Sequence, residues 1–182
     1  MEAAGKWKVL GEKVIDSSKW MDYVKSKIEL PDGKIIDYFH VRYHDAVAGV
    51  LAIDKNGRIL MVKSYRFTVD RTQWEIIAGS AEKDERMEDA ARRELKEETG
   101  YTAKRLEKLV EYYPSAGKGD HRFVLFVARG LRKASRRIDT NEIMGVRFFP
   151  VSRIRKMIER GEIMEGMTLT GLLIAFFKGM IR

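Results

Sequence analysis

The chain has 182 residues, of which 45% are hydrophobic, and a formal net charge of +8. A chain of this length can bury one sizeable core. The absence of cysteine excludes disulfides, thiolate catalysis and cysteine-based zinc sites, and it fits a reducing cytoplasm. No apolar run is long enough to span a membrane, since the nearest, residues 172–177, is followed by Lys178. The first residues lack the apolar segment of a secretory signal, so we expect a cytoplasmic location.

The positive charge admits two interpretations. A basic surface gathers phosphates, which would suit a nucleic-acid partner. The densest basic cluster, residues 129–137, has no interleaved aromatic side chains. This pattern favours a solvated surface, so we do not expect a nucleic-acid partner, although the charge leaves that alternative open. A general field that attracts a small diphosphate is a further alternative.

Two turn signals in the first third of the chain predict β-hairpins. Pro31-Asp32-Gly33 stands between two strand-forming segments of residues 26–39. Asn56-Gly57 stands between two nearly continuous apolar runs, residues 46–53 and 58–65. Turns of this composition reverse the chain between antiparallel strands.

The rest of the chain mixes strand and helix patterns. A helix is expected to begin near Met87, with acidic residues in its first turn, and to end at Gly100. Strands and helices in this order indicate a mixed α/β sandwich and not a doubly wound parallel sheet. The other predicted elements are strands at 74–77, 106–113, 122–128 and 145–151, and helices at 152–160 and 168–178.

The helix that begins near Met87 carries carboxylates where a structural helix would carry apolar side chains. At about 100° per residue, Glu94, Glu97 and Glu98 fall inside its apolar stripe. Buried carboxylates cannot stay ionised without a cation, because unpaired charge is costly to bury. Glu94 and Glu98 are one turn apart, and their oxygens are ligands that Mg²⁺ prefers. The helix therefore predicts a metal site. The alternative is an ordinary helix with Glu–Arg pairs.

The segment from Gly79 to Tyr101 resembles the Nudix box, the signature of hydrolases that act on a nucleoside diphosphate linked to another group. Tyr101 is a mild departure, because the family more often has an aliphatic residue there. The resemblance implies a Nudix-like α/β/α sandwich with a mixed central sheet, plus antiparallel strands at the N-terminus. The residues of fixed identity that match the box are Gly79, Glu85, Arg93, Glu94, Glu97, Glu98 and Gly100.

The same resemblance implies hydrolysis that depends on Mg²⁺, with Mn²⁺ as a substitute. Bound ions would neutralise the diphosphate and lower the pKa of a water that attacks phosphorus. Gly79 would allow a tight turn before the helix, and Arg93 would fix the rotamer of a box carboxylate. Glu97 would bind a second ion or orient water. The implied metal ligands are the carbonyl of Ala78 and the carboxylates of Glu94, Glu97 and Glu98.

A base is expected to take the proton of the attacking water. In hydrolases that resemble this chain, the base is often a glutamate on a loop downstream of the box. Glu142, just before the strand predicted at 145–151, is the candidate here, and Asp139 is the reserve. The alternative is that both are ordinary solvated loop residues.

Segments around the box resemble the ADP-ribose pyrophosphatase branch of the family. Ser64-Tyr65-Arg66 corresponds to its Gln-Tyr-Arg, and residues 75–79 to its Glu-Leu-Pro-Ala-Gly. The resemblance implies cleavage of ADP-ribose into AMP and ribose 5-phosphate, with Arg66 and Glu75 as substrate contacts. Trp20 is a candidate platform for stacking the base. The alternatives are a surface salt bridge for Arg66 and simple partial burial for Trp20.

Several positions depart from that branch on the expected substrate side. Ser64 replaces glutamine, Ile77 replaces proline, and Ala116 and His121 stand where proline and glutamate are common. GDP-mannose or another nucleotide sugar is therefore an alternative substrate. Two further hypotheses are hydrolysis of RNA 5′-pyrophosphates and a non-catalytic nucleotide sensor.

The branch also suggests how the chain is organised. Its N-terminal strands help to form a homodimer that completes the substrate site. We therefore expect residues 1–45 to serve dimerisation and to contribute to the substrate site. Residues 46–182 are expected to form the Nudix hydrolase domain.

Overall fold

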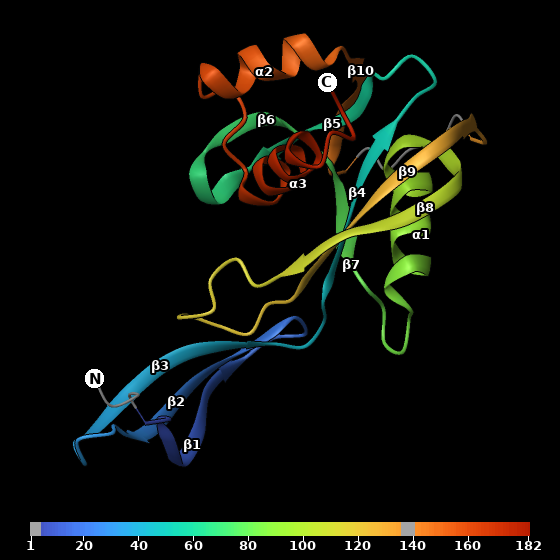
Figure 1. Cartoon of the computed structure of the whole chain (residues 1–182). Helices are drawn as coiled ribbons and strands as arrows, with labels where there is room; N and C mark the ends of the chain where they lie inside the picture. Colours follow the sequence, from blue (N-terminus) through green and yellow to red (C-terminus); the bar gives the residue numbers. More distant parts are fainter. Residues whose placement is uncertain (1–4, 136–140) are drawn as a thin grey trace. The chain divides into compact units, whose positions relative to one another are not determined.

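The computed structural model describes residues 5–135 and 141–182. Within these ranges, the chain forms ten β-strands, three α-helices and one short 3-10 helix (Figure 1). None of the helices described is both long enough and apolar enough to cross a membrane.

The chain divides into two compact units. The N-terminal unit comprises Met1–Asp45 and Ser115–His121, and the main unit comprises Ala46–Pro114 and Arg122–Arg182. A short segment from the middle of the chain therefore belongs to the N-terminal unit.

The N-terminal unit is an antiparallel sheet of three strands, β1 (Lys8–Ser17), β2 (Met21–Glu29) and β3 (Ile35–Tyr43). The predicted turn at Pro31-Asp32-Gly33 joins β2 and β3, and Gly33 supplies the positive φ of 84° that this turn needs. Every residue of β1 is exposed. The expectation of N-terminal antiparallel strands is confirmed.

The segment Ser115–His121 packs onto β3. The backbone N–H of Tyr43 donates to Asp120 Oδ1 at 2.7 Å, and the Tyr43 ring stacks on His121 at a centroid distance of 3.7 Å. Val41 pairs with Gly119 in an isolated bridge. A side chain at Gly119 would press on the backbone of Val41, so glycine is required at this close approach.

The main unit is built on a mixed sheet. Its longest row contains β10 (Ile143–Phe149), β5 (Ile59–Arg66), β4 (Val47–Ile53), β9 (Phe123–Lys133) and β8 (Tyr101–Tyr112), in that order. Two shorter strands join it: β6 (Arg71–Glu75) pairs with β5, and β7 (Ile77–Ser80) pairs with β4. β4 and β9 run parallel, whereas β4 pairs antiparallel with both β5 and β7. The predicted mixed sheet and the predicted hairpin at Asn56-Gly57 are confirmed.

Helices cover both faces of this sheet. α1 (Met87–Thr99) packs on one face, and α2 (Val151–Glu159) and α3 (Gly166–Phe177) pack on the other (Figure 1). Successive side chains of a strand point to opposite faces, so β4 serves both cores. Val50 and Ala52 contact the α1 core, while Leu51 and Ile53 contact the α2–α3 core. The predicted α/β/α sandwich is confirmed.

The boundaries of α1 follow local chemistry. The helix begins at Met87, as expected, and Glu88 and Asp89 lie in its first turn, where the helix dipole favours negative charge. Gly100 ends it in the left-handed region, with φ 69°, and its N–H donates to the Lys96 carbonyl at 2.8 Å. The predicted start of β8 is wrong by five residues, because pairing with β9 extends back to Tyr101.

Candidate active site

The carboxylates of α1 are not equally buried. Glu98 is only 7% exposed, and the side chain of Glu94 is 12% exposed. The Glu97 side chain, in contrast, is 53% exposed. The prediction that all three face the core is therefore wrong for Glu97, which lies at the edge of the apolar stripe beside the exposed Lys96.

Arg93 organises the carboxylates around it. Its Nε and Nη2 donate to the two oxygens of Glu85 at 3.0 and 2.9 Å, and Nη2 also donates to the Ser80 carbonyl at 3.0 Å. Nη1 donates to Glu94 Oε1 at 2.6 Å and to Glu97 Oε2 at 3.2 Å. These contacts use all five N–H directions of the guanidinium, and the bond to Glu85 raises the pKa of Arg93. The Glu94 side chain is thus held in one orientation.

Gly79 makes room for Glu94. It lies within β7, opposite Ala48 of β4, and it has no positive φ. The expectation that Gly79 forms a tight turn is therefore wrong. A Cβ at this position would overlap the carboxylate of Glu94. Glycine is needed here because α1 brings that carboxylate directly against the backbone of β7.

Glu98 carries the clearest sign of a cation site. Its Oε2 is buried and has no hydrogen-bond partner among the described residues. Burial, together with repulsion from Glu94, raises the pKa of Glu98 to about 9, although a backbone hydrogen bond with Ala78 acts in the opposite direction. Burial also raises the pKa of Glu94. A divalent cation would remove both penalties, so these residues fit a metal ion.

The described side chains do not by themselves form a complete set of metal ligands. Within residues 5–135 and 141–182, no three carboxylate or imidazole side chains are grouped around one metal position. The contacts of Arg93 explain part of this, because they hold Glu94 and Glu97 toward its guanidinium. Any ion here would need backbone, water or substrate oxygens in addition to carboxylates.

Arg66 and Glu75, the last residues of β5 and β6, form a partly buried ion pair. Arg66 Nε lies 3.1 Å from each Glu75 oxygen, and Nη2 donates to Oε2 at 2.5 Å. The Glu75 side chain is 3% exposed, whereas that of Arg66 is 48% exposed. Glu75 raises the pKa of Arg66, with smaller contributions from Glu165 and Glu98. The pair therefore lies within electrostatic reach of the carboxylates of α1.

The predicted base and the predicted stacking residue lie in different environments. Glu142 is exposed in the turn before β10, and its charge contributes to the raised pKa values of Glu94 and Glu98. Asp139, the reserve, lies outside the described residues. Trp20 belongs to the N-terminal unit, where it is 57% exposed and has Lys19 Nζ 4.4 Å from its ring centroid.

Sequence reasoning missed two polar residues near Arg66. Gln73 donates to Glu75, and the period of two along β6 is the signal that places them on one face. Glu165 caps α3 by accepting from the N–H groups of Met167 and Thr168, both at 2.7 Å. The hydroxyl of Thr168 also accepts from the backbone N–H of Ile76 at 3.0 Å, which ties α3 to the residue between β6 and β7.

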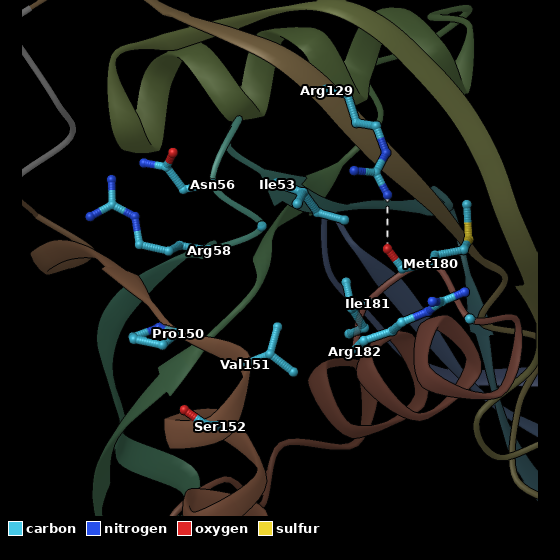
Figure 2. A pocket seen from close by; sticks show the side chains of 12 residues that line it. Ile53, Asn56, Arg58, Arg129, Pro150, Val151, Ser152, Met180, Ile181 and Arg182 are labelled. Atoms are coloured by element: carbon cyan, nitrogen blue, oxygen red, sulfur yellow. Dashed lines mark hydrogen bonds between the residues drawn. The ribbon is translucent and has the colours of Figure 1, made fainter.

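A separate cavity of about 490 Å³ lies where the β4–β5 turn meets the start of α2 and residues 179–182 (Figure 2). Three arginines line it, but two are held by the protein itself. Arg58 Nε donates to Asp54 Oδ2 at 2.7 Å. Arg129 Nη2 donates to the Met180 carbonyl at 2.9 Å (Figure 2). None of the predicted site residues lines this cavity.

Comparison with known proteins identifies the family. A family model described as a NUDIX domain matches residues 42–166. The chain is 38% identical over 163 residues to the "ADP-ribose pyrophosphatase" of Bacillus subtilis (strain 168), with 88% of each chain covered. It is 32% identical over 152 residues to the "ADP-ribose pyrophosphatase" of Mycobacterium tuberculosis (strain ATCC 25618 / H37Rv), covering 82% of this chain and 73% of that one.

A solved structure described as an "ADP compounds hydrolase" shares the fold. Its TM-score with this chain is 0.88, at 18% identity, and the match covers 99% of this chain and 98% of the other. The family model covers more than half of the chain and includes the whole segment from Gly79 to Tyr101. The chain therefore belongs to the Nudix family of hydrolases.

Proposed function

We propose that this Nudix hydrolase cleaves the diphosphate bond of ADP-ribose to give AMP and ribose 5-phosphate, and that it requires Mg²⁺. The observation that supports this most is the unpartnered, buried Oε2 of Glu98 within electrostatic reach of the partly exposed Arg66. The first group needs a cation, and the second can meet a phosphate. The two ADP-ribose pyrophosphatases similar to this chain support the choice of substrate.

The metal ligands that we propose are the Ala78 carbonyl and the carboxylates of Glu94, Glu98 and Glu97. Glu94 and Glu98 are the buried members, and Glu97 is the exposed one. Mg²⁺ would neutralise the diphosphate and make water a better nucleophile when bound, and Mn²⁺ would substitute for it. Arg93 would limit the movement of Glu94 and Glu97 through one oxygen of each carboxylate, so that the other oxygen of each could bind the ion.

The remaining residues bind substrate and move a proton. Arg66 would bind the diphosphate through the guanidinium N–H groups that Glu75 does not use. Glu75, expected above as a direct substrate contact, has a side chain that is only 3% exposed and bonded to Arg66, so we propose instead that it fixes the orientation of Arg66. Glu142 would act as the base that accepts the proton of the attacking water. Its exposed position before β10 and its electrostatic effect on Glu98 support this role.

We also propose that the N-terminal unit contributes through a homodimer. All ten residues of β1 are exposed, and they include Val9, Val14 and Ile15. An exposed edge strand that carries these apolar side chains is a liability in a monomer and suits an interface. Trp20, in the turn between β1 and β2, would stack on the base. Size measurement in solution tests the dimer, and a single-copy mass contradicts it.

A substrate panel tests the reaction. The purified protein is incubated with ADP-ribose, GDP-mannose and 5′-triphosphorylated RNA in Mg²⁺, in Mn²⁺ and in EDTA, and the products are identified. We expect AMP and ribose 5-phosphate from ADP-ribose, with no turnover in EDTA. Failure to form AMP would contradict the proposal, and preferential turnover of GDP-mannose or RNA would replace the substrate. Glu98→Gln separates an enzyme from a sensor, because only an enzyme should lose its measured function.

A further inference from the structure

Gln73 is a buried polar residue whose hydrogen bonding is only half complete. It lies on β6, opposite Ser64 of β5, and is 7% exposed. Its Nε2 donates to Glu75 Oε1 at 2.9 Å. Its Oε1 is buried and has no hydrogen-bond partner in the described part of the chain. The opposite amide orientation would set that oxygen against the Glu75 carboxylate, where two acceptors would repel each other.

This arrangement lowers the stability of the folded protein. An unpartnered buried carbonyl costs free energy, and an apolar side chain of the same volume would avoid that cost. The hydrogen bond to Glu75 is therefore what the glutamine provides that an apolar residue would not. Its value must lie in what Glu75 does.

Glu75 acts as a cradle for Arg66. Three donors converge on its carboxylate: Nε and Nη2 of Arg66, and Nε2 of Gln73. The Arg66 side chain is half exposed, whereas Gln73 is buried. Removing the buried donor would free the carboxylate to rotate, and the guanidinium would rotate with it.

The orientation of Arg66 matters for function because its Nη1 is available to a ligand. Its Nη1 makes no hydrogen bond to any residue in the described ranges, so those N–H groups remain for a ligand. A guanidinium that is already oriented loses less conformational freedom when it binds phosphate.

We propose that Gln73 is a positioning residue, which fixes the Glu75 carboxylate so that Arg66 is already oriented to bind the substrate diphosphate. The inference rests on the proposed function of this site. It assigns to Gln73 an effect on substrate affinity and not on the chemical step.

Gln73→Met tests the proposal, because methionine keeps the volume and removes both amide groups. We expect KM for ADP-ribose to rise about tenfold and kcat to change less than about twofold. This is the result of losing an interaction that stabilises the bound substrate and the transition state equally. The melting temperature should stay the same or rise, since the unpartnered oxygen is gone. Thr72→Ala, at the exposed neighbour on β6, is the matched control and should change neither constant.

A double-mutant cycle distinguishes positioning from a general packing effect. In a Glu75→Gln background, Gln73→Met should raise KM no further, because both act through one carboxylate. Gln73→Asn, which keeps the amide but is too short to reach Glu75, should behave like Gln73→Met and serves if that variant folds poorly. An unchanged KM, or an equal effect in the Glu75→Gln background, would overturn the inference.

Direct binding keeps this test separate from the choice of substrate. ADP, which contains the diphosphate, is titrated calorimetrically into the wild type and Gln73→Met. If the wild type does not hydrolyse ADP-ribose, the proposed function fails, but an affinity for ADP about tenfold lower in the variant would still support the inference. Equal affinities, or no binding of ADP to the wild type, would overturn it.

Discussion

Two arginines of the main unit, Arg93 and Arg66, both hold buried or half-buried carboxylates, yet they are arranged for different work. Arg93 directs all five N–H groups at the protein, to Glu85, Glu94, Glu97 and the Ser80 carbonyl. Arg66 uses only Nε and Nη2, on Glu75, and leaves Nη1 without a partner among the described residues. A saturated guanidinium can only organise its neighbours, whereas an unsaturated one can also bind a ligand.

The largest expected effect comes from Arg93→Lys. Lysine has three donors on a flexible stem and cannot serve five directions, so Glu94 and Glu97 should lose their fixed orientation. We expect kcat to fall by about 300-fold with a smaller change in KM, as for a loss of preorganisation. Steady-state kinetics with ADP-ribose and Mg²⁺ measure this. A change confined to KM would show that Arg93 contacts substrate and would remove the distinction from Arg66.

The pH dependence of the free energy of unfolding tests the burial of Glu98. The pKa of this residue responds both to Glu94, which Arg93 holds, and to Arg66. Its folded pKa is about 9 against a usual value of 4.5, so the folded protein binds more protons than the unfolded chain between these values. Stability in EDTA should therefore fall as pH rises, by roughly 3 kcal/mol between pH 6 and pH 8. Urea unfolding at several pH values measures the trend.

Two comparisons isolate the cause of that trend. Glu98→Gln, which carries no titrating proton, should show a flatter dependence and greater stability in EDTA at pH 8. Saturating Mg²⁺ should stabilise the wild type but not Glu98→Gln. If the variant keeps the full pH dependence, another group is responsible.

Gly79→Ala tests the placement of Glu94, one of the carboxylates that Arg93 holds. A methyl group there would displace the Glu94 carboxylate, which is the flexible end of a side chain, while β7 and α1 stay in place. We expect kcat to fall about 20-fold with little change in melting temperature, since the displaced group acts in the reaction and not in the core. Gly145→Ala is a suitable control, because a Cβ there would make only ordinary contacts. A large loss of stability would contradict the explanation.

The smallest effect is expected from Arg66→Lys. Lysine keeps the charge but loses the planar fork that meets both Glu75 and a phosphate, so KM should rise about tenfold while kcat stays within about twofold. Kinetics with ADP-ribose measure both constants. A fall in kcat as large as that of Arg93→Lys would mean that the two arginines do not differ in role.

Local signals in the sequence predict much of the fold. The turns at Pro31-Asp32-Gly33 and Asn56-Gly57, and the stop at Gly100, depend on backbone conformations that few residues adopt, so composition reveals them. Helical periodicity likewise places Glu94 and Glu98 inward. These features are decided within a few residues of chain.

Features that depend on distant partners are not predictable in the same way. Helical periodicity alone cannot show that Glu97 lies outside the buried stripe, because the width of that stripe is set by what packs against α1. The need for glycine at position 79 comes from Glu94, fifteen positions along the chain, and is visible only once β7 and α1 are packed. The packing of residues 115–121 on β3 has no local signal either.

That last segment has a consequence for how this protein can be altered. Residues 115–121 are joined to β3 by the bridge between Val41 and Gly119 and by the bond from the Tyr38 hydroxyl to the Gly117 carbonyl. The N-terminal sheet is therefore not a cassette that a single cut near residue 45 would release. A chimera that exchanges this sheet between related enzymes would have to exchange the β8–β9 connection with it. The N-terminal sheet and residues 115–121 should therefore be inherited together.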